Sequence, residues 1–125
     1  MLQKLLWLAL AGALGTLARY GLAGFLHRFN GGSFPWGTVA VNISGCLMAG
    51  FLWTLFESRW PVTGEVRTAV LVGFLGAFTT FSTLILETGE MLRLADWTGA
   101  VGNIAFQNVL GIVALFAGVA IGRII

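Results

Sequence analysis

The sequence predicts an all-α membrane protein with four spanning helices. Of its 125 residues, 58% are hydrophobic and only 10% are charged, and the mean hydropathy is +0.91. These values lie outside the range of soluble domains. Four apolar runs are each long enough to cross a bilayer, which takes about 20 residues of helix. Strands of a membrane barrel alternate apolar and polar residues, so continuous runs favour helices.

The expected spans cover residues 5–26, 36–56, 66–92 and 98–124, and together they form the single domain expected over residues 1–125. Turn-forming residues separate them, with Pro35 before the second span and Pro61 before the third. The start of the chain imitates a signal peptide, because Lys4 precedes an apolar run. Since that run continues to Phe25, we expect an uncleaved first helix. The short connections leave no room for a separate catalytic domain.

Basic residues are expected in nearly equal numbers at the two membrane faces. One face would hold Lys4, Arg59, Arg67 and Arg123, and the other Arg19, Arg28 and Arg93. An excess of Lys and Arg on the cytoplasmic side normally fixes the orientation of a membrane protein. The balance therefore predicts a weak preference or insertion in both orientations, which permits an antiparallel dimer. Because these residues form no basic run, nucleic acid is excluded as a partner.

Eighteen glycines predict close helix packing, because small residues let backbones approach one another in lipid. The candidates are Gly12, Gly15, Gly45, Gly111, Gly118 and Gly122. We expect some of them to pack between subunits, and packing within one subunit is the alternative.

Polar side chains inside spans are costly and mark candidate functional positions. Arg19 would attract anions if it faced a water-filled vestibule, or it would extend to the membrane surface. Asn42 can donate two N–H groups to an anion or bond a neighbouring helix. Asn103 and Gln107 lie one turn apart on one helix face, which lines a path or bonds another helix. Thr38, near the start of the second span, is interpreted as a local cap or backbone partner.

The third span is expected to break near its middle. The run Gly73–Thr83 combines glycines with four hydroxyl residues, which is unfavourable for a continuous helix. Free carbonyls at membrane depth must be buried in protein or line a cavity, where they can hold a dehydrated cation. Ring edges of its phenylalanines and its hydroxyls could together replace the water around an anion, although plain packing is the alternative for the rings.

Three motifs follow one another along the chain: Gly12-xx-Gly15-xxx-Arg19-Tyr20, then Phe34-Pro35-Trp36-Gly37-Thr38-xxx-Asn42, then the run Gly73–Thr83. In order and spacing they closely resemble the Fluc/CrcB family of fluoride channels. The resemblance covers nearly the whole chain. It implies an antiparallel, dual-topology dimer with two pores and a broken third helix, which exports fluoride passively and selectively across a bacterial inner membrane.

The resemblance also implies roles for individual residues. A structural sodium ion at the dimer centre would be held by the backbone carbonyls of Gly76 and Thr79. Arg19 would create a positive vestibule. The fluoride pathway would be lined by Asn42, Phe81, Thr80, Thr83, Asn103 and Gln107.

The chain departs from the family pattern at two places. Leu84 stands where a second phenylalanine is usual, and the fourth helix has Asn103 and Gln107 where Tyr or Asn, then Ser or Asn, are usual. A gap of one residue would replace Gln107 by Asn108. These departures leave open a subunit of a heterodimeric channel that does not conduct alone.

A second alternative is a small multidrug exporter, which requires a carboxylate inside the membrane. Glu87, late in the third span, is the candidate, although contact with water is its simpler interpretation. We expect no enzyme, because His27 has no second ligand or nucleophile beside it. The single Cys46 excludes a disulfide within the chain.

Overall fold

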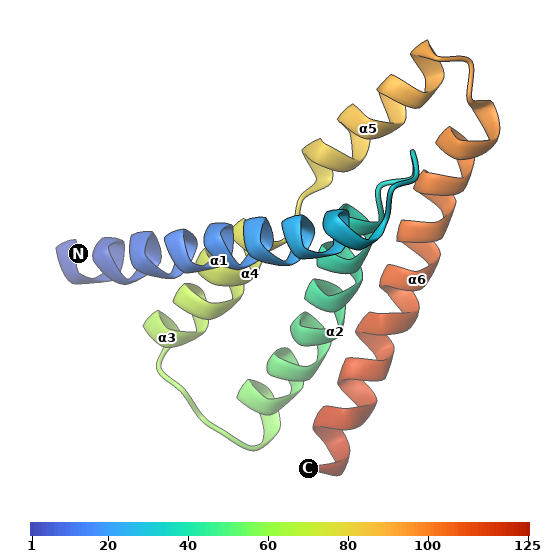
Figure 1. Cartoon of the computed structure of the whole chain (residues 1–125). Coiled ribbons are helices and arrows are strands. Elements are labelled where there is room, and N and C mark those ends of the chain that lie inside the picture. The colour runs from blue at the N-terminus through green and yellow to red at the C-terminus, as the bar shows by residue number, and fades with distance from the viewer.

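The computed structural model describes residues 1–125 and is entirely helical (Figure 1). It contains four helical units that are long and apolar enough to span a membrane. They are α1 (Leu2–Phe29), α2 (Trp36–Ser58), the third unit from Gly64 to Arg93, and α6 (Trp97–Ile124). The predicted fold class is confirmed, and each helix begins and ends within a few residues of its expected span.

The third unit is divided, as the glycine- and hydroxyl-rich run predicts. It consists of α3 (Gly64–Thr68), the π-helix η1 (Ala69–Phe74), α4 (Leu75–Phe78) and α5 (Phe81–Arg93). Thr79 and Thr80 between α4 and α5 are extended, with ψ of 159° and 113°. Thr80 also caps α5, because its Oγ1 accepts a hydrogen bond of 3.2 Å from the Thr83 N–H. The backbone thus leaves the helix for two residues and re-enters it immediately.

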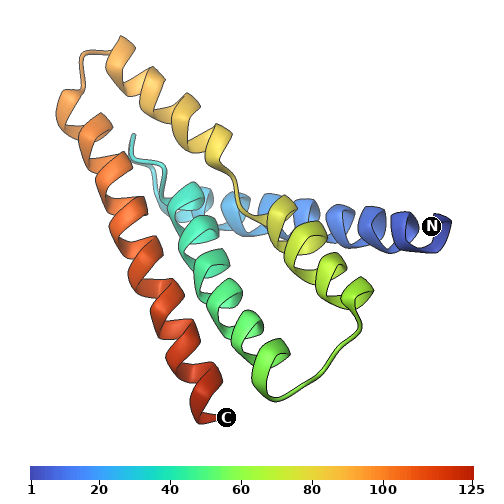
Figure 2. The ribbon, with the colours of Figure 1, turned by 180° about the vertical axis from the view of Figure 1, so that it is seen from behind.

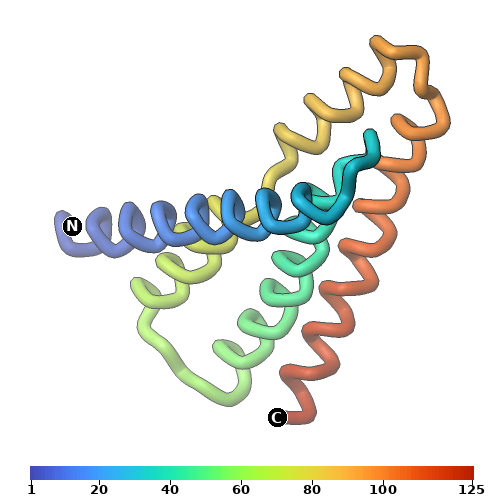
Figure 3. The backbone as a smooth tube through the Cα atoms, in the orientation of Figure 1, coloured from blue at the N-terminus to red at the C-terminus, as the bar shows by residue number.

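The two halves of this broken span contact different partners. The first half, from α3 to α4, lies against α1, whereas α5 diverges and lies against α6 (Figure 2). α2 and α6 lie side by side and run in the same direction, with the most extensive contact between any two helices, and α1 crosses them at a steep angle (Figure 3). The break therefore lies near the middle of the molecule, beside α1 and α2.

Glycines allow these helices to touch backbone to backbone. A Cβ added at Gly118 would overlap the Leu47 carbonyl oxygen of α2, and one at Gly15 would overlap the Phe74 carbonyl oxygen of η1. Gly45 faces the Thr79 side chain in the break. Gly111 and Gly122 also lie close to α2, whereas Gly12 makes only an ordinary van der Waals contact. Five of the six candidate glycines therefore have close contacts within one subunit, which supports the alternative interpretation of their role.

Candidate ion pathway

Asn42 of α2 holds the break in the third span. Its Oδ1 accepts a hydrogen bond of 2.8 Å from the Thr80 N–H, and its Nδ2 donates one of 3.1 Å to the Thr80 carbonyl oxygen. A backbone group left unpaired in lipid is costly. One side chain therefore satisfies both backbone groups of the residue at the break.

A row of hydrogen-bonded side chains continues from Asn42 into α6 and α5. Asn42 Nδ2 donates to Gln107 Oε1 at 2.7 Å, and Gln107 Nε2 donates to Asn103 Oδ1 at 2.8 Å. Asn103 Nδ2 then donates to Thr88 Oγ1 at 3.0 Å, and Thr88 Oγ1 donates to the Leu84 carbonyl oxygen at 2.7 Å. We call these four side chains, Asn42, Gln107, Asn103 and Thr88, the amide row. In every link the donor lies on the Asn42 side.

The structure brings Asn103 and Gln107 together on the shared face that their spacing indicates. Both side chains are buried, with Asn103 0% and Gln107 5% exposed. Asn108 is exposed and donates only to the Ile104 carbonyl of its own helix. Gln107, not Asn108, is thus the residue of α6 that meets Asn42.

Phe81 and Leu84 differ sharply in exposure at the start of α5. Phe81 is 72% exposed, whereas Leu84 is only 5% exposed. Both line a cavity of about 240 Å³ that also borders Asn42 and Gln107. The exposed ring of Phe81 and the amides of Asn42 and Gln107 thus border the same cavity.

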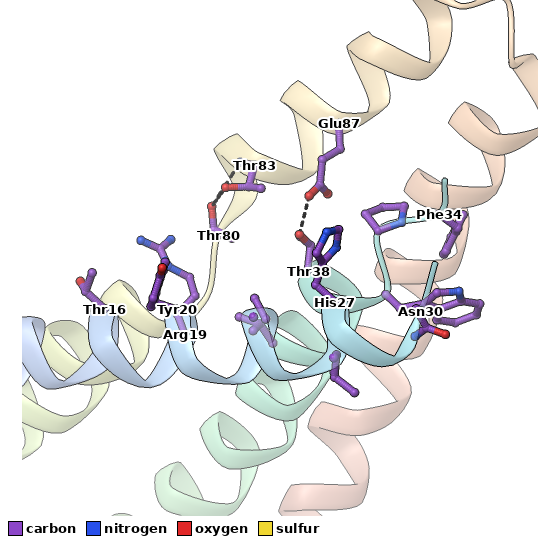
Figure 4. A pocket seen from close by; sticks show the side chains of 17 residues that line it. Thr16, Arg19, Tyr20, His27, Asn30, Phe34, Thr38, Thr80, Thr83 and Glu87 are labelled. Atoms are coloured by element: carbon purple, nitrogen blue, oxygen red, sulfur yellow. Dashed lines mark hydrogen bonds between the residues drawn. The ribbon is translucent and has the colours of Figure 1, made fainter. Parts of the chain in front are cut away.

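A second cavity, of about 470 Å³, lies on the other side of the break, between α1, α2 and α5 (Figure 4). Arg19 projects into it from α1, and Thr80 and Thr83 face it from the start of α5. The hydroxyl of Thr80 donates to that of Thr83 at 2.9 Å. The two ion pairs of the chain, Arg67–Glu57 and Arg93–Glu90, do not involve Arg19. Its charge is therefore available to raise the local anion concentration.

Glu87 also lines this second cavity, although from the sequence it was considered only for the exporter alternative and not for an anion pathway. Thr38 Oγ1 donates to Glu87 Oε1 at 2.6 Å, and Glu87 Oε2 is buried without a hydrogen-bond partner (Figure 4). The interpretation of Thr38 as a local cap is wrong, since it bonds a different helix. Thr80, Thr83 and Glu87 are spaced three and four residues apart, and this helical spacing is the signal that could have placed Glu87 on the cavity face.

Comparisons with known proteins agree with these features. The family model described as CrcB-like protein, Camphor Resistance (CrcB), matches residues 6–119. The chain belongs to this family. A relative from Desulforapulum autotrophicum named fluoride-specific ion channel FluC is 62% identical over 125 residues, the whole of both chains. Relatives with the same name from Nitrosococcus oceani and Solidesulfovibrio magneticus are 51% and 50% identical, also over both whole chains.

Membership of the CrcB family bears on the function classes considered from the sequence. These relatives are named as ion channels and not as enzymes or drug exporters. The expectation of a non-enzymatic, multi-pass membrane protein is therefore confirmed, and the exporter alternative is not favoured.

The resemblance to this family implies a sodium site at the carbonyls of Gly76 and Thr79, and both carbonyl oxygens are free in this structure. In an unbroken helix the Thr80 N–H would bond the Gly76 carbonyl, but it bonds Asn42 instead. No N–H of the chain donates to the carbonyls of Gly76 or Thr79. Both residues line a surface cavity of about 600 Å³ between α2, the third span and α6. Unpaired carbonyl oxygens of this kind fit a dehydrated sodium ion.

Proposed function

We propose that the chain is a fluoride-selective channel that lets fluoride leave the cytoplasm down its electrochemical gradient, in a bacterial inner membrane. The observation that carries the proposal is the pair of cavities on either side of Thr80, one containing Arg19 and the other bordered by Asn42 and Gln107. The names of the full-length relatives supply the ion.

The chemistry of the lining suits a small, strongly hydrated anion. Selectivity in a pore depends on groups that replace the water lost by the ion. Asn42 and Gln107 carry amide N–H groups, Thr80 and Thr83 carry hydroxyls, and Phe81 has a ring with positive edges. Arg19 would concentrate anions at the entrance and repel cations. A larger halide needs a wider path and gains less from the same few donors.

We also infer that two copies assemble in antiparallel orientation. Phe81 is largely exposed, and the cavity bordered by Gly76 and Thr79 is open, so one chain alone leaves the pathway without a wall. A second copy would close both openings, and the near balance of basic residues permits the required dual topology. A sodium ion between the copies would supply positive charge to the free carbonyls of Gly76 and Thr79. A homologous partner in place of a second copy remains the alternative that Leu84 suggests.

Ion efflux from liposomes tests the proposal. The purified chain is reconstituted alone, with sodium present, and fluoride and chloride efflux are recorded in parallel. Fast fluoride efflux without chloride efflux is expected. Equal efflux of both ions contradicts selectivity, and the absence of fluoride efflux contradicts a channel made of this chain alone.

A further inference from the structure

The hydrogen bonds of the amide row run in a direction that leaves no N–H group of Asn42 free for an anion. Both N–H groups of Asn42 Nδ2 are used, one by the Thr80 carbonyl and one by Gln107 Oε1. Gln107 presents its oxygen to the point where an anion would meet Asn42. A fluoride ion beside Asn42 and Gln107 would therefore face a carbonyl oxygen, which repels it. The inference that follows rests on the proposed function.

We propose that Gln107 is a fluoride ligand whose side-chain amide rotates when the ion arrives, so that its NH2 group and its oxygen exchange places. The carboxamide oxygen and NH2 group are similar in size, so this rotation exchanges an acceptor for a donor with little change of shape. The Gln107 Nε2 would then point to the cavity of about 240 Å³ that it borders together with Asn42. An ion there would accept one N–H from each residue.

The neighbours of Gln107 make this rotation possible without leaving a buried group unpaired. A turned Gln107 would place Oε1 against Asn103 Oδ1, two acceptors in contact, unless Asn103 turned as well. Asn103 would then donate its Nδ2 to Gln107 and accept from the Thr88 hydroxyl. That hydroxyl would rotate away from the Leu84 carbonyl, to which it now donates. Because Asn103 is completely buried, an unpaired amide there is costly, and the turns must occur together.

Counting the bonds shows that the rotation conserves them. The amide row now makes four hydrogen bonds in sequence, ending on the Leu84 carbonyl. After reversal Asn42 and Gln107 donate to the ion, Asn103 donates to Gln107, and Thr88 donates to Asn103. Asn42 keeps both bonds to Thr80 throughout, so the break stays closed. Asn103 and Thr88 are positioning residues in this scheme, because neither borders the cavity.

Side-chain amide signals in NMR spectra of the reconstituted chain test the rotation directly. Fluoride is titrated at constant ionic strength, with chloride as the control, and the signals are assigned by single substitutions. The amides of Asn42, Gln107 and Asn103 are expected to shift together with one midpoint, and chloride is expected to leave them unchanged. A shift of Asn42 alone, or no shift in a chain that conducts fluoride, overturns the inference.

Fluoride efflux of Thr88 variants supplies a second test away from the ion. Thr88→Val removes the hydroxyl that accepts from Asn103 now and would donate to it after reversal, so the buried Asn103 amide loses the partner that positions it in both states. Efflux is expected to slow about tenfold, the effect of one lost hydrogen bond. Thr88→Ser is expected to restore efflux. Thr98→Val, at an exposed residue of α6 that does not border the cavity, is expected to leave it unchanged. Normal efflux in a folded Thr88→Val chain overturns the inference. If Thr88→Val does not fold, the NMR result decides.

Wild-type efflux separates this inference from the proposed function. If the wild-type chain conducts fluoride but its Gln107 and Asn103 signals do not move, only the amide rotation is wrong. If the wild-type chain conducts no fluoride, the proposed function itself fails, and the rotation fails with it.

Discussion

At the scale of single residues, one amide does two tasks that the sequence did not reveal. Asn42 was expected to meet either an anion or a neighbouring helix, and it bonds the break of the third span and Gln107 at once. The sequence placed Asn103 and Gln107 on a common face, but their partner lies 65 residues away from Gln107. Spacing along one helix identifies a face, whereas the element packed against it depends on tertiary structure.

Asn42→Leu tests the importance of the clamp on Thr80. The substitution leaves the N–H and carbonyl of Thr80 and the oxygen of Gln107 without partners, and each unsatisfied buried group costs about 1–3 kcal/mol. We expect a lower melting temperature in detergent and loss of fluoride efflux. Gln3→Leu is the matched control, because Gln3 is an exposed amide of α1 that does not border the cavity beside Asn42. Equal melting temperatures for the two variants would contradict a structural role for Asn42.

Thr38→Val tests the contact between Thr38 and Glu87. The variant keeps the side-chain shape but removes the 2.6 Å hydrogen bond to Oε1, so neither carboxylate oxygen of Glu87 then has a partner. We expect slower fluoride efflux, since an unpaired carboxylate then faces the cavity that contains Arg19. Thr38→Ser retains the hydroxyl and is expected to conduct normally. Equal efflux from both variants would show that this hydrogen bond has no part in conduction.

At the scale of helices, glycine contacts determine how closely the spans approach. The number of glycines predicted close packing, and the sequence could not decide between contacts within and between subunits. Gly118 meets the Leu47 carbonyl and Gly15 meets the Phe74 carbonyl, both within the chain. The break was predictable because Gly and Thr are locally unfavourable in a helix. The π-helix η1 before it was not, since nothing in the Ala69–Phe74 sequence distinguishes it from an α-helix.

Gly118→Ala is expected to destabilise the contact between α2 and α6. Its Cβ would overlap backbone atoms of Leu47 and Phe51, which cannot move aside like the end of a side chain. Overpacking of this kind typically costs about 1–3 kcal/mol. Gly102→Ala on the same helix meets nothing within 4 Å and should be neutral or slightly stabilising. Reversible unfolding in mixed micelles measures both, and similar losses would mean that the close approach at Gly118 is unimportant.

At the scale of the whole molecule, the four spans were predictable from the length and position of the apolar runs. In lipid every backbone polar group must be paired within the protein, so a long apolar run at membrane depth must form a helix. The charge balance concerns assembly, which a single chain does not display. The exposed Phe81 and the free carbonyls of Gly76 and Thr79 are nevertheless features of a surface that a partner would cover.

Thiol labelling tests the proposed dual topology. In a Cys46→Ala chain, single cysteines are introduced at Ser33 and, separately, at Thr63, in loops expected at opposite membrane faces. A membrane-impermeant reagent should label about half of the molecules in each case, as expected for insertion in both orientations. Complete labelling of one loop and none of the other would establish a single orientation.

Sodium removal tests the proposed role of the backbone carbonyls. Replacing sodium by a large organic cation should lower the melting temperature of the dimer, because the free carbonyls of Gly76 and Thr79 lose the ion that they would coordinate. Thr79→Ser should show the same sodium dependence, since the carbonyl and not the side chain is the ligand. Stability that is independent of sodium would remove the ion from the proposal.

The amide row also constrains how the chain is made. It joins α2, the second span to leave the ribosome, to α6, the last. While the first three spans enter the membrane, the fourth has yet to follow, so Gln107 and Asn103 are still absent from the bilayer and only Asn42 holds the break in the third span. The last span must then carry the two amides of the row into lipid and pack them against α2 and α5. Correct insertion of the fourth span therefore depends on prior assembly of the others, and a chain truncated after Arg93 would leave Asn42 and Thr88 without the partners that α6 supplies.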